Sequence, residues 1–316
     1  MKIRDLQVTY QSGGKRFTAV RGQSFDLAEG DALGILGESG AGKSTIGLAM
    51  LGLIERPNEV KGQILYREKD VLRMKETELA AYRWKEVSLV FQAAMNALDP
   101  VITVGKNFSQ LLHDKLVISG SQKVKQQYME KMLAMVKLPP QVTGMYPFEL
   151  SGGMKQRVII AMALCTNPKI LIADEPTTAL DTITQFSILS LIRQLRINGQ
   201  IPSSILISHD IAVQSFLSDR LIVMYKRSIV EEGKVNEVLK SAMHPYTRGL
   251  IGSLTIAYKK STNSRPDNSK GKLNVLENSC PYASYCPHAM EKCFEEFPKM
   301  VRLGETHKTA CFLYGA

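Results

Sequence analysis

The sequence predicts an α/β fold: a core sheet with an antiparallel β layer before it, a helical insertion inside it and a small cysteine-rich extension after it. Short apolar segments that indicate buried strands alternate with helical stretches, and these segments are residues 32–36, 87–91, 170–173 and 204–208. Apolar and polar side chains alternate over residues 3–10 and 23–27, which is typical of an antiparallel layer with one exposed face. Four of the five cysteines lie within the last 37 residues.

The antiparallel layer carries two aromatic candidates for stacking on an adenine ring. Tyr10 ends the first alternating segment, and Phe17 follows a turn at residues 11–15. An aromatic residue on a strand is more often an ordinary core or surface side chain, so adenine stacking and this ordinary role both stay open. Of the pair, we favour Tyr10.

The strand at residues 32–36 leads into a glycine-rich loop that fits the phosphate-loop pattern G-x-x-x-x-G-K-[ST]. The loop consists of Gly37, Glu38, Ser39, Gly40, Ala41, Gly42, Lys43, Ser44 and Thr45. A helix is expected over residues 45–53, so backbone N–H groups and the helix dipole would point at an anion. Lys43 is expected to reach the β- and γ-phosphates and Ser44 to bind Mg²⁺. A chance glycine turn is the alternative, and the flanking strand and helix argue against it.

Gln92 follows the next buried strand, residues 87–91. It is a candidate to reach Mg²⁺ or the attacking water, although a glutamine in this position more often caps the strand end. The pattern then becomes helical and polar, which predicts an insertion at about residues 93–165. Pro139 and Pro140 end its central helix.

A second possible anion site opens the last helix of the insertion. Ser151 can cap that helix, and Gly152 and Gly153 leave its first N–H groups open to a phosphate. On its own, this pattern is a common helix cap.

Two carboxylates end the strand at residues 170–173, where parallel sheets place their ligands. Asp174 fits the carboxylate that anchors Mg²⁺, and Glu175 is placed to polarise a water for attack on the γ-phosphate. His209 ends the following strand and is a candidate to orient that water. A helix-capping role is the alternative for His209.

The last part of the chain carries Cys280, Cys286, Cys293 and Cys311, separated by five, six and seventeen residues. Four thiols in a short segment indicate a metal more than disulfides in a cytosolic chain, and the candidates are a [4Fe–4S] cluster, Zn²⁺ or free thiols. The boundaries follow from these patterns: a main domain at 1–240, a helical connection at 241–258, a linker at 259–273 and the cysteine module at 274–316.

Composition bounds the location and the partners. Of 316 residues, 44% are hydrophobic and 22% are charged, which is ordinary for a soluble protein. No apolar run approaches the roughly 20 residues of a membrane span, and the start of the chain lacks a signal-peptide core, so we expect a cytoplasmic protein. The net charge of +10 would suit nucleotides, nucleic acid or an anionic membrane, but without long basic runs a solvated surface is favoured.

The ordered set of motifs resembles the ATP-binding subunit of an ABC transporter over about residues 1–240. The set comprises the phosphate loop, Gln92, the segment from Leu150 to Met154, the strand ending in Asp174 and Glu175, the sequence Ala179, Leu180 and Asp181, and His209. The resemblance implies a head-to-tail dimer that sandwiches two ATP molecules, with each phosphate loop facing the Ser151 segment of the other subunit. It also implies that Asp181 communicates across the dimer and that Gln92 lies near the membrane subunits.

Two residues depart from the family pattern. Met154 stands where relatives have glutamine, and Ala93 follows Gln92 where many relatives have aspartate. We expect hydrolysis to survive both changes, whereas the coupling to the membrane subunits is less defined.

The extension narrows the resemblance to the dipeptide/oligopeptide importer subfamily, which includes nickel importers. The motifs are residues 244–247 with the sequence His-Pro-Tyr-Thr and the Cys-Pro pairs at Cys280 and Cys286. The resemblance favours an iron–sulfur cluster over zinc. It implies an ATPase at the cytoplasmic face of the membrane, with a second and unlike ATPase subunit, two permeases and an extracytoplasmic binding protein. A soluble ABC ATPase acting on nucleic acid or the ribosome is the alternative from another class.

Overall fold

The fold is described from a computed structural model that covers residues 1–115, 121–258 and 279–315. The predicted linker at 259–273 and the first residues of the predicted module lie outside the described residues. The described helices include none long and apolar enough to cross a membrane.

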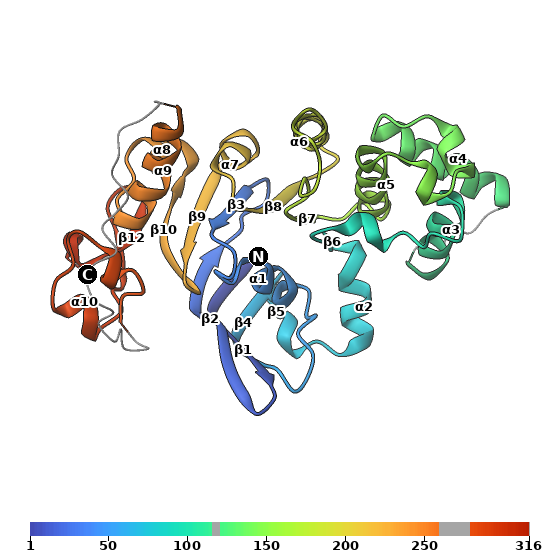
Figure 1. The fold of residues 1–316 in the computed structure, drawn as a ribbon. Coiled ribbons are helices and arrows are strands. Elements are labelled where there is room, and N and C mark those ends of the chain that lie inside the picture. The colour runs from blue at the N-terminus through green and yellow to red at the C-terminus, as the bar shows by residue number, and fades with distance from the viewer. Residues whose placement is uncertain (116–120, 259–278, 316) are drawn as a thin grey trace.

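An eight-stranded sheet forms the centre of the described structure, in the order β11-β12-β10-β9-β3-β8-β7-β6 (Figure 1). Its parallel strands are β3 (Ala32–Gly37), β6 (Val87–Val90), β7 (Ile170–Asp174), β8 (Ser203–Ser208) and β9 (Arg220–Tyr225). The first four of these were expected as buried strands and have mostly buried side chains. Because they are parallel, their carboxyl ends meet at one edge of the sheet, which is where the predicted site residues follow them.

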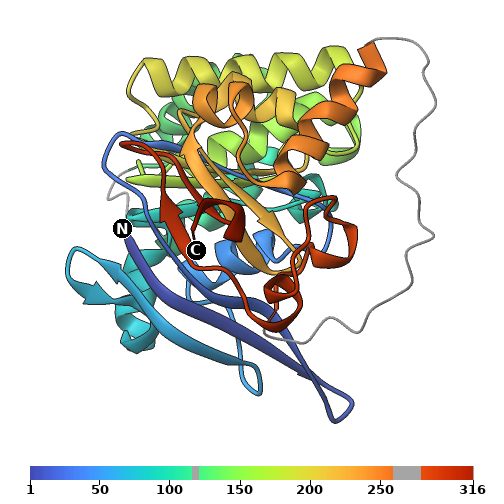
Figure 2. The ribbon, with the colours of Figure 1, turned by 90° about the vertical axis from the view of Figure 1, so that its left-hand side faces the viewer.

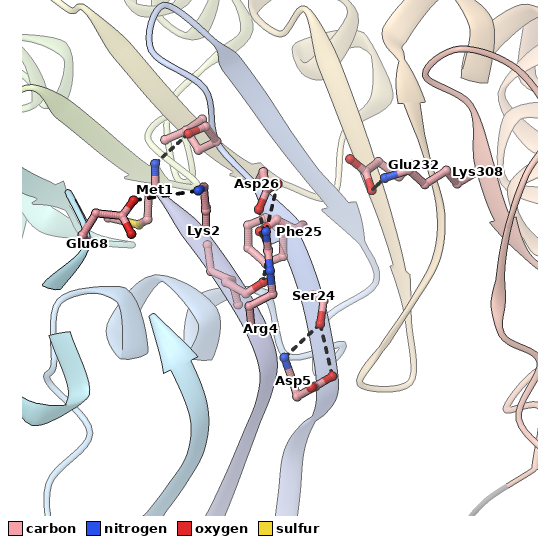
Figure 3. A network of polar contacts seen from close by, with 12 residues as sticks. Met1, Lys2, Arg4, Asp5, Ser24, Phe25, Asp26, Glu68, Glu232 and Lys308 are labelled. Atoms are coloured by element: carbon pink, nitrogen blue, oxygen red, sulfur yellow. Dashed lines mark hydrogen bonds and ion pairs between the residues drawn. The ribbon is translucent and has the colours of Figure 1, made fainter. Parts of the chain in front are cut away.

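A second sheet packs on the first and confirms the predicted antiparallel layer. It has the order β2-β1-β4-β5, with β1 (Lys2–Ser12), β2 (Lys15–Asp26), β4 (Glu59–Tyr66) and β5 (Lys69–Asp70). The inward side chains of β1, such as Ile3 and Leu6, are fully buried in a cluster that also contains Ile35 of β3 and Ile46 of α1 (Lys43–Met50). Ion pairs such as that between Arg4 and Asp26 cross the exposed face of this layer (Figure 3).

The predicted insertion is helical, and it lies at the far end of the sheet beyond β6 (Figure 1). Its helices are α3 (Val104–Lys115), α4 (Gln122–Met135) and α5 (Gly152–Leu164), preceded along the chain by α2 (Glu76–Lys85). Phe108, Leu112 and Leu133 are fully buried where these helices meet. The cluster continues under α6 (Thr182–Ile197), so the insertion is packed firmly on the core.

The cysteine-rich extension continues the core sheet. The antiparallel strand β10 (Ser228–Lys234) pairs with β12 (Lys308–Ala310), which pairs with β11 (Met300–Arg302) (Figure 2). Glu231, fully buried on β10, accepts a hydrogen bond from His307 Nε2 at 2.7 Å, and Lys308 pairs with Glu232 at 3.4 Å (Figure 3). The remaining helices here are α8 (Val235–Lys240), α9 (Pro245–Tyr258) and α10 (Lys292–Glu295).

The sequence patterns did not predict β11, β12 or the short helix α7 (Ile211–Leu217). Each extension strand has only three residues, too few to show an alternating pattern. Asp210 caps α7, since its carboxylate accepts from the backbone N–H of Ala212 at 2.7 Å.

Candidate functional site

The glycine-rich loop joins β3 to α1 and is shaped by left-handed backbone. Gly42 has φ of +96°, and a side chain there would meet the carbonyl oxygen of Ala19 at 2.3 Å, so only glycine fits. Lys43 is buried, and its Nζ donates to the carbonyl oxygens of Gly37 at 2.8 Å and Glu38 at 3.0 Å. Burial lowers the pKa of Lys43, and nearby carboxylates oppose that shift. The loop thus holds its lysine within the ring of backbone that would enclose a phosphate.

Asp174 and Ser44 lie side by side beneath this loop. Asp174 is 8% exposed, and its Oδ1 atom is buried without a hydrogen-bond partner in the described structure. Burial raises the pKa of the Asp174 carboxyl, while a hydrogen bond from Ser44 opposes the rise. An orphaned buried carboxylate oxygen beside a hydroxyl is the hard-oxygen donor set that Mg²⁺ prefers, so these residues fit the predicted ion.

Glu175 is the centre of a hydrogen-bonded group at the carboxyl edge of the sheet. Its Oε1 accepts from His209 Nδ1 at 2.9 Å, and its Oε2 accepts from Thr178 Oγ1 at 2.9 Å and from Gln92 Nε2 at 3.2 Å. Its backbone has φ of +45°, held by the N–H bond to the carbonyl oxygen of Ile207 at 2.9 Å. The structure therefore brings together three residues that the sequence predicted separately: Gln92, Glu175 and His209.

Thr178 was missed by the sequence reasoning. The available signal was a threonine three residues after a carboxylate, a spacing at which a hydroxyl reaches back in a turn. Thr178 also lines a pocket next to Glu175, together with Gln185, Ser208 and His209. The pocket gives a small polar molecule such as water access to the Glu175 carboxylate.

The hydrogen-bond partners of Glu175 favour the ionised form of its carboxyl. Burial pushes its pKa upward, but hydrogen bonds from His209 and Thr178 outweigh burial, and the net pKa is lowered. We expect His209→Ala to raise this pKa, so the acid limb of kcat plotted against pH should move to higher pH. An unmoved acid limb in a folded variant would show that His209 does not tune Glu175.

Ser151 caps α5, as predicted, with its Oγ accepting from the backbone N–H of Met154 at 3.3 Å. Gly152 and Gly153 leave the first N–H groups of α5 accessible, and they also allow close packing. A Cβ on Gly152 would lie 3.0 Å from a Leu180 methyl group, and one on Gly153 would lie 2.6 Å from Thr184 Cγ2. The glycines therefore let the start of α5 approach α6 closely.

We expect Gly153→Ala to destabilise the fold by about 1–3 kcal/mol, because the added methyl group must push α5 away from Thr184. Chemical denaturation measures the change. The double variant Gly153→Ala with Thr184→Ser removes the clashing methyl group and should recover most of the loss. Equal stability of the single variant and the wild type would contradict the packing role.

The α5 cap lies apart from the phosphate loop of the same chain. In Figure 1, α5 stands within the helical insertion, and α1 lies beneath the centre of the sheet. Asp181 caps α6, since its carboxylate accepts from the N–H groups of Ile183 at 3.1 Å and Thr184 at 3.0 Å. Its predicted role across a dimer stays a prediction.

The two aromatic candidates occupy different surroundings. The Tyr10 hydroxyl donates to Thr45 Oγ1 at 3.5 Å, which puts this half-buried side chain beside the start of α1. Phe17 is 48% exposed, and the guanidinium of Arg227 lies 3.9 Å from its ring centroid. Arg227 thus covers one face of Phe17, and the adenine contact proposed for Tyr10 stays a prediction.

Cys280, Cys286, Cys293 and Cys311 line one cavity in the extension, and all four are free thiols. Burial raises the pKa of Cys280 to about 11 and also raises those of Cys286 and Cys311. Within the described residues, however, no group of three or more Cys, His, Asp or Glu side chains has an arrangement that could hold a metal ion. The thiols suit a soft metal chemically, but their geometry does not support the predicted iron–sulfur cluster.

Comparisons with known protein families give two matches. A profile described as an ABC transporter covers residues 20–178, and one described as the oligopeptide/dipeptide transporter C-terminal region covers residues 230–293. The chain is 39% identical to the dipeptide transport ATP-binding protein DppD of Caldanaerobacter subterraneus, over 99% of this chain and 97% of that protein. It is 37% identical to the oligopeptide transport ATP-binding protein OppD of Bacillus subtilis, over 99% of this chain and 88% of that protein.

A solved structure shares the core fold. It is described as a dimeric post-hydrolysis state of the ATP-binding cassette MJ0796 bound to ADP and Pi. The TM-score is 0.66 at 29% identity, with 74% of this chain and 98% of that chain covered.

Proposed function

This chain belongs to the ATP-binding subunits of ABC transporters, and from that membership we propose that it hydrolyses ATP to power the import of dipeptides or oligopeptides. The observation that carries the hydrolytic role is the Glu175 carboxylate, which accepts hydrogen bonds from Gln92, Thr178 and His209. The match of the extension to a peptide-transporter region supports the substrate class.

The geometry supports a separate role in ATP hydrolysis for each of these residues. Mg²⁺, held by Ser44 and Asp174 with Gln92 nearby, would neutralise charge on the phosphates. Lys43 would turn from its backbone acceptors to the β- and γ-phosphates. Glu175, ionised and fixed by His209 and Thr178, would orient the attacking water and take its proton. Tyr10 would stack on the adenine.

We propose that two such subunits face head to tail, so that the Ser151 segment of one completes the phosphate loop of the other. The separation of α5 from α1 within one chain supports this arrangement, since α5 stands in the helical insertion and α1 lies near the centre of the sheet (Figure 1). The likeness to a structure described as dimeric supports it as well. Asp181 would then lie near the interface, and the second subunit would be an unlike ATPase chain.

The further partners would be two membrane permeases and an extracytoplasmic binding protein, with this chain at the cytoplasmic face of the membrane. Affinity purification of the native assembly tests the proposal: permeases should co-purify. Recovery of ribosomes or nucleic acid in their place would favour the soluble class of ABC ATPase. Uptake of labelled dipeptides and of Ni²⁺ into vesicles carrying the assembly then separates peptide import from nickel or metal-chelate import.

The four cysteine thiols do not form a metal site in the described arrangement, and on donor chemistry alone we propose that they draw together around a [4Fe–4S] cluster. Four free thiols from separate turns of the extension line the same cavity, and thiolates are the usual ligands of such clusters. The visible spectrum and the iron content of anaerobically purified protein test it. Zinc without iron, or no metal at all, would overturn the proposal.

A further inference from the structure

A cluster of tyrosines lies between the phosphate loop and the cysteine cavity. The rings of Tyr225 and Tyr246 lie 4.4 Å apart between centroids, and Tyr282 meets them edge-on at 5.3 Å and 5.6 Å. Tyr225 comes from the core strand β9, Tyr246 from α9 and Tyr282 from the extension. The cluster thus joins three parts of the chain that are distant in sequence.

One end of the cluster touches the phosphate loop. Gly37, which opens the loop, is paired with Met224 of β9, and a Cβ on Gly37 would lie 2.4 Å from the Met224 carbonyl oxygen. Tyr225 is the next residue. The loop residue Glu38 is also close to Tyr246, because its carboxylate is the main influence after burial that raises the pKa of that tyrosine.

The Tyr246 hydroxyl has an unusual position. Tyr246 is 4% exposed, and the groups that bear on its buried hydroxyl by hydrogen bonding are the backbone and the carboxylate of Glu38. Glu38 is exposed and belongs to the phosphate loop, so a shift of the loop changes its contact with Tyr246.

The other end of the cluster forms the wall of the cysteine cavity. Tyr282 lines that cavity together with His244 and Pro245, the two residues directly before Tyr246. The Tyr246 backbone N–H donates to His244 Nδ1 at 3.1 Å. The cavity wall is therefore connected to Tyr246 both through the backbone and through the ring of Tyr282.

We propose that Tyr246 is a positioning residue for the phosphate loop, and that through it the state of the cysteine cavity sets the affinity of the same subunit for MgATP. The Tyr246 hydroxyl meets Glu38 when the loop closes, and Tyr282 passes a change at the cavity to Tyr246. The inference rests on nucleotide binding at this loop and is independent of the transported substrate and of what the cavity holds.

A double-mutant cycle in the full-length chain tests the link, with the dissociation constant of MgATP as the measurement. Cys286→Ser alters the least buried of the four cavity thiols and is expected to change this constant about fivefold, within the usual range of coupling between sites. In the Tyr246→Phe background the same change should have almost no effect. Tyr246→Phe itself should raise KM for ATP several-fold and leave kcat within about twofold, since Tyr246 does not contact Glu175.

Tyr285→Phe is the matched control, because it removes an exposed hydroxyl from the cavity side of the same cluster, where Tyr285 lies 6.3 Å from Tyr282. The cysteine effect should persist in that background. Glu38→Gln should abolish the effect as Tyr246→Phe does. Additive effects of Cys286→Ser and Tyr246→Phe, or no effect of Cys286→Ser on the wild type, would overturn the proposal. Loss of MgATP binding by every protein, the wild type included, would instead refute the nucleotide site.

Discussion

Replacing Glu175 with glutamine is expected to lower kcat for ATP hydrolysis by about 10²–10⁴-fold while MgATP binding is retained. The amide keeps the size of the side chain and its place at the end of β7. It cannot accept the proton of the attacking water, however, and it has one oxygen to accept the hydrogen bonds that now come from His209, Thr178 and Gln92. The phosphate loop is untouched, so affinity should change little.

Steady-state turnover and equilibrium binding of MgATP, measured on the same preparation, separate the two effects. Glu76→Gln serves as the control, since Glu76 is an exposed residue of α2 paired with Arg83. It should behave as the wild type in both assays. Turnover above one tenth of the wild-type rate in Glu175→Gln would assign proton transfer to another group.

Gln92, Asp174, Glu175 and His209 could be predicted from the sequence because each lies at or just after the end of a buried strand. Parallel strands expose their carboxyl ends at one edge, so Asp174 and His209 were expected at the same site from the strand pattern taken together with the phosphate-loop motif. Periodicity does not predict the direction in which a side chain points from that edge. The positive φ of Glu175 and the hydrogen bond from the Thr178 hydroxyl set the direction of the Glu175 side chain, and both depend on the local turn.

Contacts between segments that are distant in sequence were the other feature that the sequence did not predict. The loop glycines are predictable from a motif, whereas the contact of Gly153 with Thr184 depends on the way α5 meets α6. The same holds for the extension: four cysteines indicated a separate module, but the burial of Glu231 against His307 shows that its hairpin continues the core sheet. A three-residue strand leaves no periodic signal in the sequence.

Replacing Asp174 with asparagine is expected to raise the Mg²⁺ concentration needed for half-maximal ATPase activity at least about tenfold. The amide oxygen can still face the ion, but the negative charge is lost, and Ser44 alone is a weak ligand for a hard dication. Titration of ATPase activity with Mg²⁺ measures the change. Asp219→Asn, which affects an exposed partner of Arg196, is the matched control and should leave the titration unchanged.

The same substitution should stabilise the protein in the absence of Mg²⁺. Burial holds the pKa of Asp174 above its usual value, so the ionised carboxylate is less stable in the folded chain than in the unfolded one. The wild type therefore loses stability as the pH rises from the unfolded pKa through the folded pKa, and the variant does not. We expect a higher Tm for Asp174→Asn at pH 7 with chelator present, and no such advantage below the unfolded pKa of aspartate. A lower Tm of Asp174→Asn at pH 7 would mean that the buried carboxylate oxygen has a stabilising partner. An unchanged Mg²⁺ titration would remove Asp174 from the ion site. If Asp174 is a buried Mg²⁺ ligand, the substitution should therefore raise the stability of the metal-free protein and lower its affinity for Mg²⁺.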